Sequence, residues 1–271
     1  MKKILLISFI FLFCLSESFA DVISGKVRQD DKLYAQNQVV DSKTQEPVEK
    51  AKVSIPKQGF QTYTDHDGRF ELNTKIDNST VLSVEKEGFR PYSLTIDKNS
   101  LNQPLKLGIE RSKSGDIQLE TSLLHLGDDV FADTSANSSD FKIKSSGTFY
   151  TKGFKMSPIS NNEEAVIVIG SVLGLDTKLA KEMGQNRIAS VYSSPAEIFF
   201  NGQKIGELNI NGDNQEILIP KNLIKRDNEV TVRTGKNLFQ HAYIDYDDIE
   251  LTNIRVETRD KKMYAGGLEG F

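Results

Sequence analysis

Short runs in which apolar and polar residues alternate recur along this chain, and each run is closed by turn-forming residues. Between residues 36 and 110 these runs are Lys52–Ile55, Phe60–Tyr63, Arg69–Leu72, Val81–Glu85 and Tyr92–Ile96. Successive side chains of a strand point to opposite faces, so a period of two is typical of strands with one buried face. The region shows no helical periodicity. The pattern therefore predicts a small antiparallel β-sandwich over residues 36–110.

A second β-rich region follows the polar residues 111–117, which we interpret as a linker. Asn201-Gly202 is the strongest two-residue hairpin signal in the chain. The spacing of Leu175, Leu179 and Met183 predicts one short helix. The strands predicted here are Ala165–Ile169, Glu197–Phe200, Gln203–Gly206, Glu216–Ile219, Glu229–Val232 and Ile249–Val256. The predicted fold class is all-β, with two β-sandwiches in tandem: the second covers residues 118–258, and a loose tail follows at 259–271.

The first twenty residues have the order of a secretory signal peptide. Lys2 and Lys3 precede the apolar run Ile4–Leu15, and Ala20 ends a cleavage site of small residues. The apolar run is too short for a stable membrane anchor. We expect a secreted, periplasmic or cell-surface protein with no transmembrane segment after cleavage. Residues 21–35 would form an N-terminal arm.

Composition excludes several classes of function. The chain has 34 basic and 38 acidic residues, a net charge of −4, which argues against a nucleic-acid partner. With three histidines and one cysteine, it has neither a zinc cluster nor a disulfide scaffold. That cysteine, Cys14, lies within the predicted signal peptide, and its lipidation is the alternative to simple cleavage. No nucleophile elbow occurs and no pair of acids stands out by spacing, so we predict that the protein is not an enzyme.

The first half resembles the carboxypeptidase-regulatory-like domain, a transthyretin-like sandwich. The resemblance rests on Val39-Val40-Asp41, Glu46-Pro47-Val48, Ala51-Lys52-Val53, Thr64-Asp65-His66-Asp67-Gly68-Arg69-Phe70 and Gly88-Phe89. It covers residues 36–110. The resemblance implies a non-catalytic domain that serves as a scaffold or adhesion module in secreted proteins.

The second half is similar to galactose-binding-like jelly rolls, the fold of many carbohydrate-binding modules. The residues that carry this likeness are Pro195–Gly202, Asn228–Val232 and Asp245–Glu250. They are signals of the fold rather than of a ligand. The resemblance implies a jelly roll over residues 118–258.

Carbohydrate binding needs aromatic faces and polar groups for the hydroxyls. The candidate sugar-binding residues are Arg187, Tyr192, Phe239 and Tyr243, which the sequence places in predicted loops. The chain has no tryptophan, and packing in the core is the alternative for each aromatic residue. The case for carbohydrate depends mainly on the resemblance of the fold.

Acidic pairs suggest one structural calcium ion. Asp128-Asp129 opens the second sandwich and Asp247-Asp248 precedes its last strand, while related modules hold Ca²⁺ between their first and last strands. The alternative is that these acids are solvated. Asp65-His66-Asp67-Gly68 lacks the further ligands of a calcium loop and is interpreted as a hairpin turn. His66, His125 and His241 are each interpreted as surface residues.

These observations favour a secreted or cell-surface binding protein that recognises a glycan through the second sandwich. The alternative is a structural, adhesion or envelope assembly protein, whose exposed strand edges pair with an envelope or extracellular protein. No cofactor other than the calcium ion is expected.

Overall fold

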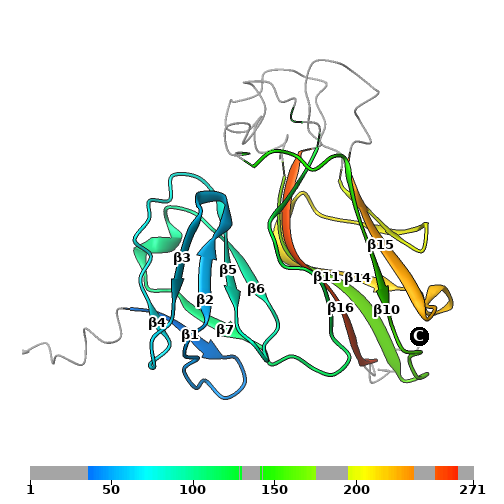
Figure 1. The fold of residues 1–271 in the computed structure, drawn as a ribbon, viewed down its shortest axis with the longest axis horizontal. Helices are drawn as coiled ribbons and strands as arrows, with labels where there is room; N and C mark the ends of the chain where they lie inside the picture. Colours follow the sequence, from blue (N-terminus) through cyan, green and yellow to red (C-terminus); the bar gives the residue numbers. More distant parts are fainter. Residues whose placement is uncertain are drawn as a thin grey trace, which may run out of the picture.

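The computed structural model describes residues 36–127, 129, 141, 143–174, 195–234 and 248–261 (Figure 1). These residues are nearly all β, so the prediction of an all-β fold is confirmed. Among them no helix has the length and apolar character needed to cross a membrane. The residues predicted to form the signal peptide, the N-terminal arm and the short helix, and most of the predicted tail, lie outside the described residues.

The first sandwich contains two sheets. One has the order β4-β1-β7 and the other the order β3-β2-β5-β6. Two short 3₁₀ helices, η2 (Pro56–Gln58) and η3 (Ser100–Asn102), join its strands. The strands are β1 (Asn37–Asp41), β2 (Lys52–Ile55), β3 (Phe60–Tyr63), β4 (Arg69–Phe70), β5 (Thr80–Glu85), β6 (Tyr92–Ile96) and β7 (Lys106–Ile109).

The second sandwich also contains two sheets. We call the sheet with the order β14-β11-β16-β8, in which β9 also pairs with β16, the β11–β16 sheet, and the sheet with the order β10-β15-β12-β13 the β12–β15 sheet. A 3₁₀ turn, η4 (Lys221–Leu223), precedes β15. The strands are β8 (Ile117–Glu120), β9 (Leu124–Leu126), β10 (Phe149–Lys155), β11 (Glu163–Gly174), β12 (Glu197–Phe200), β13 (Gln203–Glu207), β14 (Asn211–Ile219), β15 (Asp227–Arg233) and β16 (Ile249–Asp260). Assignment of this sandwich to the jelly rolls stays a prediction.

Each sandwich encloses its own hydrophobic core. In the first, Leu72 and Leu94 are partly buried against a centre that includes Val53, Ile55, Phe70, Leu82, Val84 and Ile96. In the second, β11 and β16 supply much of the core, together with residues from β12 and β15. The predicted hairpin at Asn201-Gly202 joins β12 to β13, with φ of 50° and 81°. Both values lie in the left-handed region that such a turn requires.

A row of irregular residues crosses the β11–β16 sheet. Gly170 of β11 lies between Asn214 of β14 and Asn253 of β16, and both asparagines have positive φ, 51° and 57°. Alternate side chains of β16 change sides of the sheet at this row. Before it the odd-numbered residues Ile249 and Leu251 point into the core, and after it the even-numbered residues Ile254 and Val256 do so. The residues that alternate with Ile249 and Leu251, namely Asp248 and Glu250, therefore lie on the outer face of the sheet.

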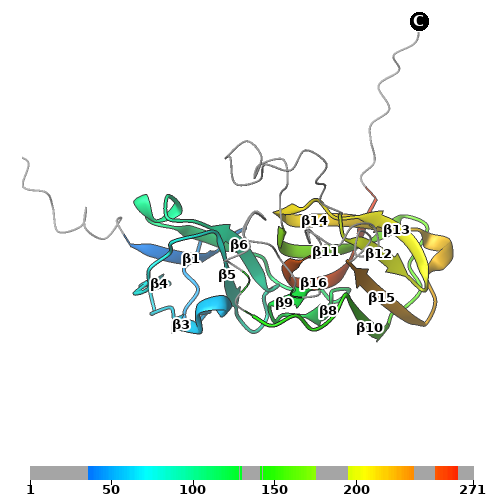
Figure 2. The same cartoon turned by 90° about the horizontal axis from the view of Figure 1, so that it is seen from above.

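The first sandwich docks on that outer face through its edge strand β6, which contacts β11, β14 and β16 (Figure 2). Asp213 accepts hydrogen bonds from Thr95 N (3.0 and 3.1 Å) and from Thr95 Oγ1 (2.9 Å). Ser171 Oγ donates to Ser93 Oγ at 3.0 Å. A Cβ on Gly170 would lie 2.4 Å from Ser93 Oγ and 2.7 Å from Asn253 Cβ, so only glycine fits there. Edge strands expose unpaired backbone groups, and this docking covers the free edge of β6.

Arg90 joins the two sandwiches at a second point. Its guanidinium donates to both carboxylate oxygens of Asp116 in the linker, at 2.7 and 2.8 Å. It also forms ion pairs with Glu110 at 2.6 Å and with Glu257 of β16 at 3.2 Å. Burial acts to raise the pKa of Asp116, but the bonds from Arg90 and from Lys113 N outweigh it and lower the pKa. Arg90 is therefore paired with an Asp116 carboxylate that stays ionised at the domain boundary.

Candidate functional site

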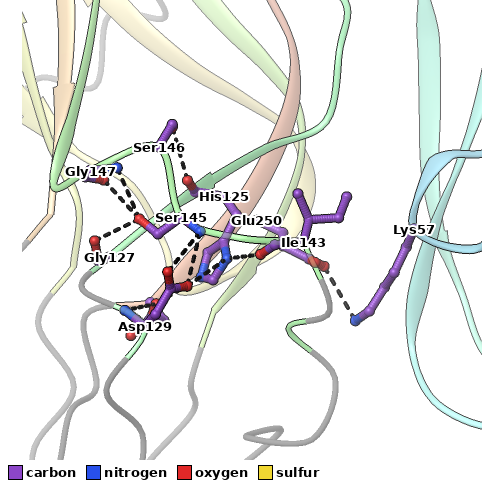
Figure 3. Close-up of polar contacts among 10 residues, drawn as sticks. Lys57, His125, Gly127, Asp129, Ile143, Ser145, Ser146, Gly147 and Glu250 are labelled. Atoms are coloured by element: carbon purple, nitrogen blue, oxygen red, sulfur yellow. Dashed lines mark hydrogen bonds and ion pairs between the residues drawn. The ribbon is translucent and has the colours of Figure 1, made fainter.

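A cluster of charged side chains is buried where the outer face of the β11–β16 sheet meets the first sandwich (Figure 3). His125 of β9 pairs across the ladder with Glu250 of β16, and Asp248 stands immediately before β16. Lys57 of η2 reaches this face from the first sandwich. The strand register therefore places an imidazole and two carboxylates side by side, and the domain contact adds an ammonium group.

Both ring nitrogens of His125 face hydrogen-bond acceptors. Nε2 lies 2.7 Å from Asp248 Oδ1. Nδ1 contacts the carbonyl oxygen of Ile143 and lies 3.6 Å from Asp129 Oδ1. A neutral imidazole can donate from one nitrogen only, whereas the imidazolium donates from both. The geometry therefore favours the protonated ring.

The pKa of His125 is raised above its usual value. Burial acts to lower it, but the hydrogen bonds to Asp248 and to the Ile143 carbonyl, with the negative charges of Asp248 and Asp129, outweigh burial. A buried charge is stable only when it is paired and hydrogen-bonded, and this ring has both kinds of support.

The interpretation of His125 as a surface residue is wrong. Its side chain is 0% exposed, because residues 143–147 cover it and the ring of Phe141 stacks on it at 5.0 Å. His66 is 80% exposed in the Asp65–Gly68 turn, as predicted. His241 lies outside the described residues. The burial of His125 could not be predicted from its neighbours in sequence, because residues 141 and 143–147, which cover the ring, are not adjacent to it in the chain.

Lys57 and Glu250 form an ion pair across the domain junction. The Nζ–Oε2 distance is 3.4 Å, and the side chains are 7% and 1% exposed. Lys57 Nζ also lies 5.8 Å from the centre of the Phe141 ring, whose face attracts a cation. Sequence analysis missed this pair, since the two residues are 193 positions apart and neither belongs to a motif.

Two of the four predicted calcium ligands come together. Asp129 N donates to Asp248 Oδ1 at 3.4 Å, while Asp128 and Asp247 lie outside the described residues. Ligand atoms of His125, Asp129 and Asp248 all lie within 4.8 Å of one another. Asp248 Oδ2 is buried without a hydrogen-bond partner in the described part of the chain. These three residues could hold a cation, and the calcium ion itself stays a prediction.

The cluster is unsuited to catalysis on an external substrate. His125 and Asp248 are both fully buried, and Ser145, the nearby hydroxyl, bonds to backbone carbonyls at Gly127 and Gly147. A general base must reach the proton it removes, and this imidazole does not reach solvent. The arrangement places the imidazole beside two carboxylates, which favours the protonated form of the ring.

The predicted sugar-binding residues Arg187, Tyr192, Phe239 and Tyr243 lie outside the described residues. A different aromatic surface is visible on the outer face of the β12–β15 sheet. Phe149 of β10 is 61% exposed, and Arg233 of β15 lies over the ring of Phe199 of β12 at 4.6 Å. Sequence analysis missed this face because it assigned no strand to residues 149–155. The alternation of Phe149 with Tyr150, whose ring packs on the core, was the available signal.

Comparisons with solved structures give only remote likenesses. BuGH86 in its complex with neoagarooctaose is 12% identical, with a TM-score of 0.29, over 77% of this chain and 26% of that chain. Latent dimeric PorU from Porphyromonas gingivalis is 10% identical, with a TM-score of 0.26, over 78% of this chain and 22% of PorU. The chain thus spans about a quarter of the length of each of these proteins. A proposed carbohydrate binding protein from Bacteroides uniformis is 10% identical, with a TM-score of 0.20, over 83% and 97% of the two chains. At such scores the likenesses carry no argument.

The comparison with curated proteins finds no match. A family model does match part of the chain. Residues 36–122 match the CarboxypepD_reg-like domain, and this range contains the whole first sandwich and extends through β8 of the second. The first sandwich is therefore a CarboxypepD_reg-like domain, in agreement with the resemblance seen in its sequence.

Proposed function

We propose that the protein is an exported, non-catalytic binding protein and that its second sandwich binds carbohydrate. One observation carries this proposal. The first sandwich occupies the outer face of the β11–β16 sheet, whereas no segment of the described residues covers the outer face of the β12–β15 sheet, which bears the exposed ring of Phe149 and the guanidinium of Arg233. The docked domain acts as a support, and the open face offers the aromatic and polar groups that sugars need.

Two further points support binding rather than catalysis. The matched domain of the first sandwich is regulatory-like and has no catalytic role. The histidine–carboxylate pair of the second sandwich is fully buried. Export follows from the predicted signal peptide over residues 1–20, and the site of action would be the periplasm, the cell surface or the medium.

A glycan array probed with the mature chain, residues 21–271, tests this proposal. We expect retention on a limited set of polysaccharides and no release of reducing ends from those that bind. Heat-unfolded chain is the control for non-specific adhesion. An array on which the folded chain binds nothing contradicts the carbohydrate proposal, and release of sugar fragments contradicts the non-catalytic one.

Strand edges favour the second candidate, a structural or envelope assembly protein. Within the described residues β3 pairs only with β2, and β10 pairs only with β15, so each strand leaves one edge open. An extended partner segment can add to such an edge. Two results together would favour this candidate. The glycan array would show no binding, and the chain would capture an envelope protein that a variant with proline within β10 no longer captures.

A further inference from the structure

We propose that an uncharged polysaccharide chain lies across the outer face of the β12–β15 sheet, between Phe149 and Phe199. This inference rests on the proposed function and names the place and the charge class of the ligand. It assigns the contact to the sheet face rather than to the loops predicted from sequence.

The strand register gathers the residues of this surface into two rows. Arg233 pairs with Phe149 on one side and with Glu197 on the other, and Glu197 pairs with Glu207. The second row crosses the same strands two residues away on β10, β15 and β12 and three residues away on β13, where the register shifts. The members of the first row are Phe149, Arg233, Glu197 and Glu207, and those of the second are Thr151, Thr231, Phe199 and Lys204. We call these eight residues the two-row surface.

Phe149 and Phe199 stand on β10 and β12, with β15 between them. Two strand spacings separate such positions by about 10 Å across the sheet. The Phe149 side chain is 61% exposed, and the Phe199 ring is half-buried beneath Arg233. The exposed Phe149 ring, held on a rigid strand, can receive the apolar C–H face of one sugar unit, and the Phe199 ring supports the guanidinium that faces the next unit.

Arg233 is fixed in place by its neighbours. Its Nε and Nη2 donate to Glu197 Oε2 at 3.2 and 2.5 Å, and its guanidinium carbon lies 4.6 Å from the centre of the Phe199 ring. The side chain is still 54% exposed. A guanidinium carries five N–H donors, so three of them stay available to hydroxyl groups. Because the fork is already oriented, little side-chain entropy is lost on binding.

The charges of the two-row surface cancel. Lys204 Nζ contacts Glu197 at 2.7 Å and Glu207 at 2.5 Å, and Arg233 completes the network, so two cations face two anions. The bonds from Lys204 and Arg233 lower the pKa of Glu197, which keeps its charge. Thr151 and Thr231 add a hydroxyl pair 2.9 Å apart. A surface of balanced charge complements an uncharged polyhydroxyl chain better than an acidic polysaccharide or a highly charged protein.

Affinity electrophoresis of the mature chain tests the inference, with gels that contain neutral polysaccharides (xylan, mannan, β-glucan, agarose) or acidic ones (alginate, pectate). We expect retardation by at least one neutral polymer. Phe149→Ala and Arg233→Met should each weaken it about tenfold, a change worth about 1.4 kcal/mol. Tyr63→Ala is the matched control, since Tyr63 is 59% exposed on β3 of the first sandwich, and it should leave retardation unchanged.

Thr151→Glu provides a blocking variant. Thr151 is exposed on β10, so the longer, charged side chain should abolish retardation while far-UV circular dichroism and melting stay as in the wild type. If the variants Phe149→Ala, Arg233→Met and Thr151→Glu all bind as tightly as the wild type, the two-row surface is not the binding site. The proposed function would still stand. Failure of the wild type on every polymer would overturn both. Retardation by acidic polymers alone would contradict the inference that the ligand is uncharged. If the wild type is a dimer and Phe149→Ala dissociates it, a second copy of the chain covers this face instead.

Discussion

Among the described residues, two groups of one histidine and two aspartates have ligand atoms that lie close together, and the two groups have opposite surroundings. Asp65, His66 and Asp67 are neighbours in sequence and lie in an exposed turn, whereas His125, Asp129 and Asp248 come from distant segments. The turn was predicted to close a hairpin, but β3 and β4 on its two sides belong to different sheets. In the first group, Asp65 Oδ1 accepts from the backbone N–H groups of Asp67 and Arg69 at 2.9 and 2.8 Å. In the second, the carboxylates surround a buried ring.

The difference shows that burial, rather than composition, decides what such a group does. Exposed charges are screened by water, so the first group contributes mainly through the backbone bonds of the turn. Buried charges must be paired, so each member of the second group depends on the others. Four experiments address this contrast.

Asp248→Ala should have the largest effect. It leaves the His125 ring buried beside Ile143 and Asp129 without its principal partner, and loss of one member of a buried pair costs about 3–5 kcal/mol. Urea unfolding followed by circular dichroism would measure the change. Asp67→Ala in the exposed turn is the matched control, expected within about 0.5 kcal/mol of the wild type. Equal effects of the two variants would show that the contrast between the groups is not real.

Lys57→Met should have the next effect. It keeps most of the apolar side chain but removes the charge that faces Glu250 across the junction. Hydrogen bonds to charged groups contribute about 1.5–3 kcal/mol, and we expect a loss of unfolding free energy in this range. Lys52→Met is a suitable control, because the Lys52–Glu85 pair has the same chemistry but is 37% exposed on both sides. A loss no larger than that of Lys52→Met would contradict a structural role for the junction pair.

The effect of pH on the free energy of unfolding should be smaller than the effects of the two substitutions above, and gradual. A change of pH alters the charge of His125 but removes no side chain. The pKa of His125 is raised in the folded state, and Asp248, Asp129, Glu250 and Lys57 are the charged groups that face it. Its stabilising contribution is complete below the unfolded pKa of about 6.5 and is lost as the pH rises through the folded value. His125→Gln should reduce this dependence in unfolding curves measured from pH 5 to pH 9. An unchanged slope would mean that the ring is neutral in the folded protein.

His66→Gln should have the smallest effect, within about 0.5 kcal/mol, as is usual at exposed positions. The same unfolding curves would measure it, with no change expected in the pH dependence. A loss comparable to that of His125→Gln would show that the turn has a contact beyond those of the described residues.

Local patterns in the sequence predicted most of the strands. Lys52–Ile55 and Tyr92–Ile96 are strands with the predicted bounds, and Asn201-Gly202 forms the predicted hairpin. Such features depend on neighbours in sequence, through alternation and through the φ that a turn requires. β10 was missed because Gly153 and two lysines interrupt its apolar pattern, and most of its residues are exposed.

The candidate sites were much less predictable. Asp129 and Asp248 were found because acidic pairs flank strands, but the burial of His125 depends on residues 143–147, and Glu250 meets Lys57 only through domain docking. The charge network of Arg233, Glu197 and Lys204 requires the cross-strand register, which a bulge between Ile198 and Phe199 shifts. A single sequence carries no signal for contacts of this kind.

The docking of β6 on the outer face of the β11–β16 sheet has a consequence for dividing the chain. Val81, Val166 and Val168 are each 1% exposed, although they belong to neither hydrophobic core. Val81 shares its face of the sheet with Ser93 and Thr95, which bond to the second sandwich. A fragment that ends in the linker would expose such valines beside an open strand edge, a combination that promotes aggregation. The unit that can be expressed, transplanted or inherited intact is therefore the pair of sandwiches.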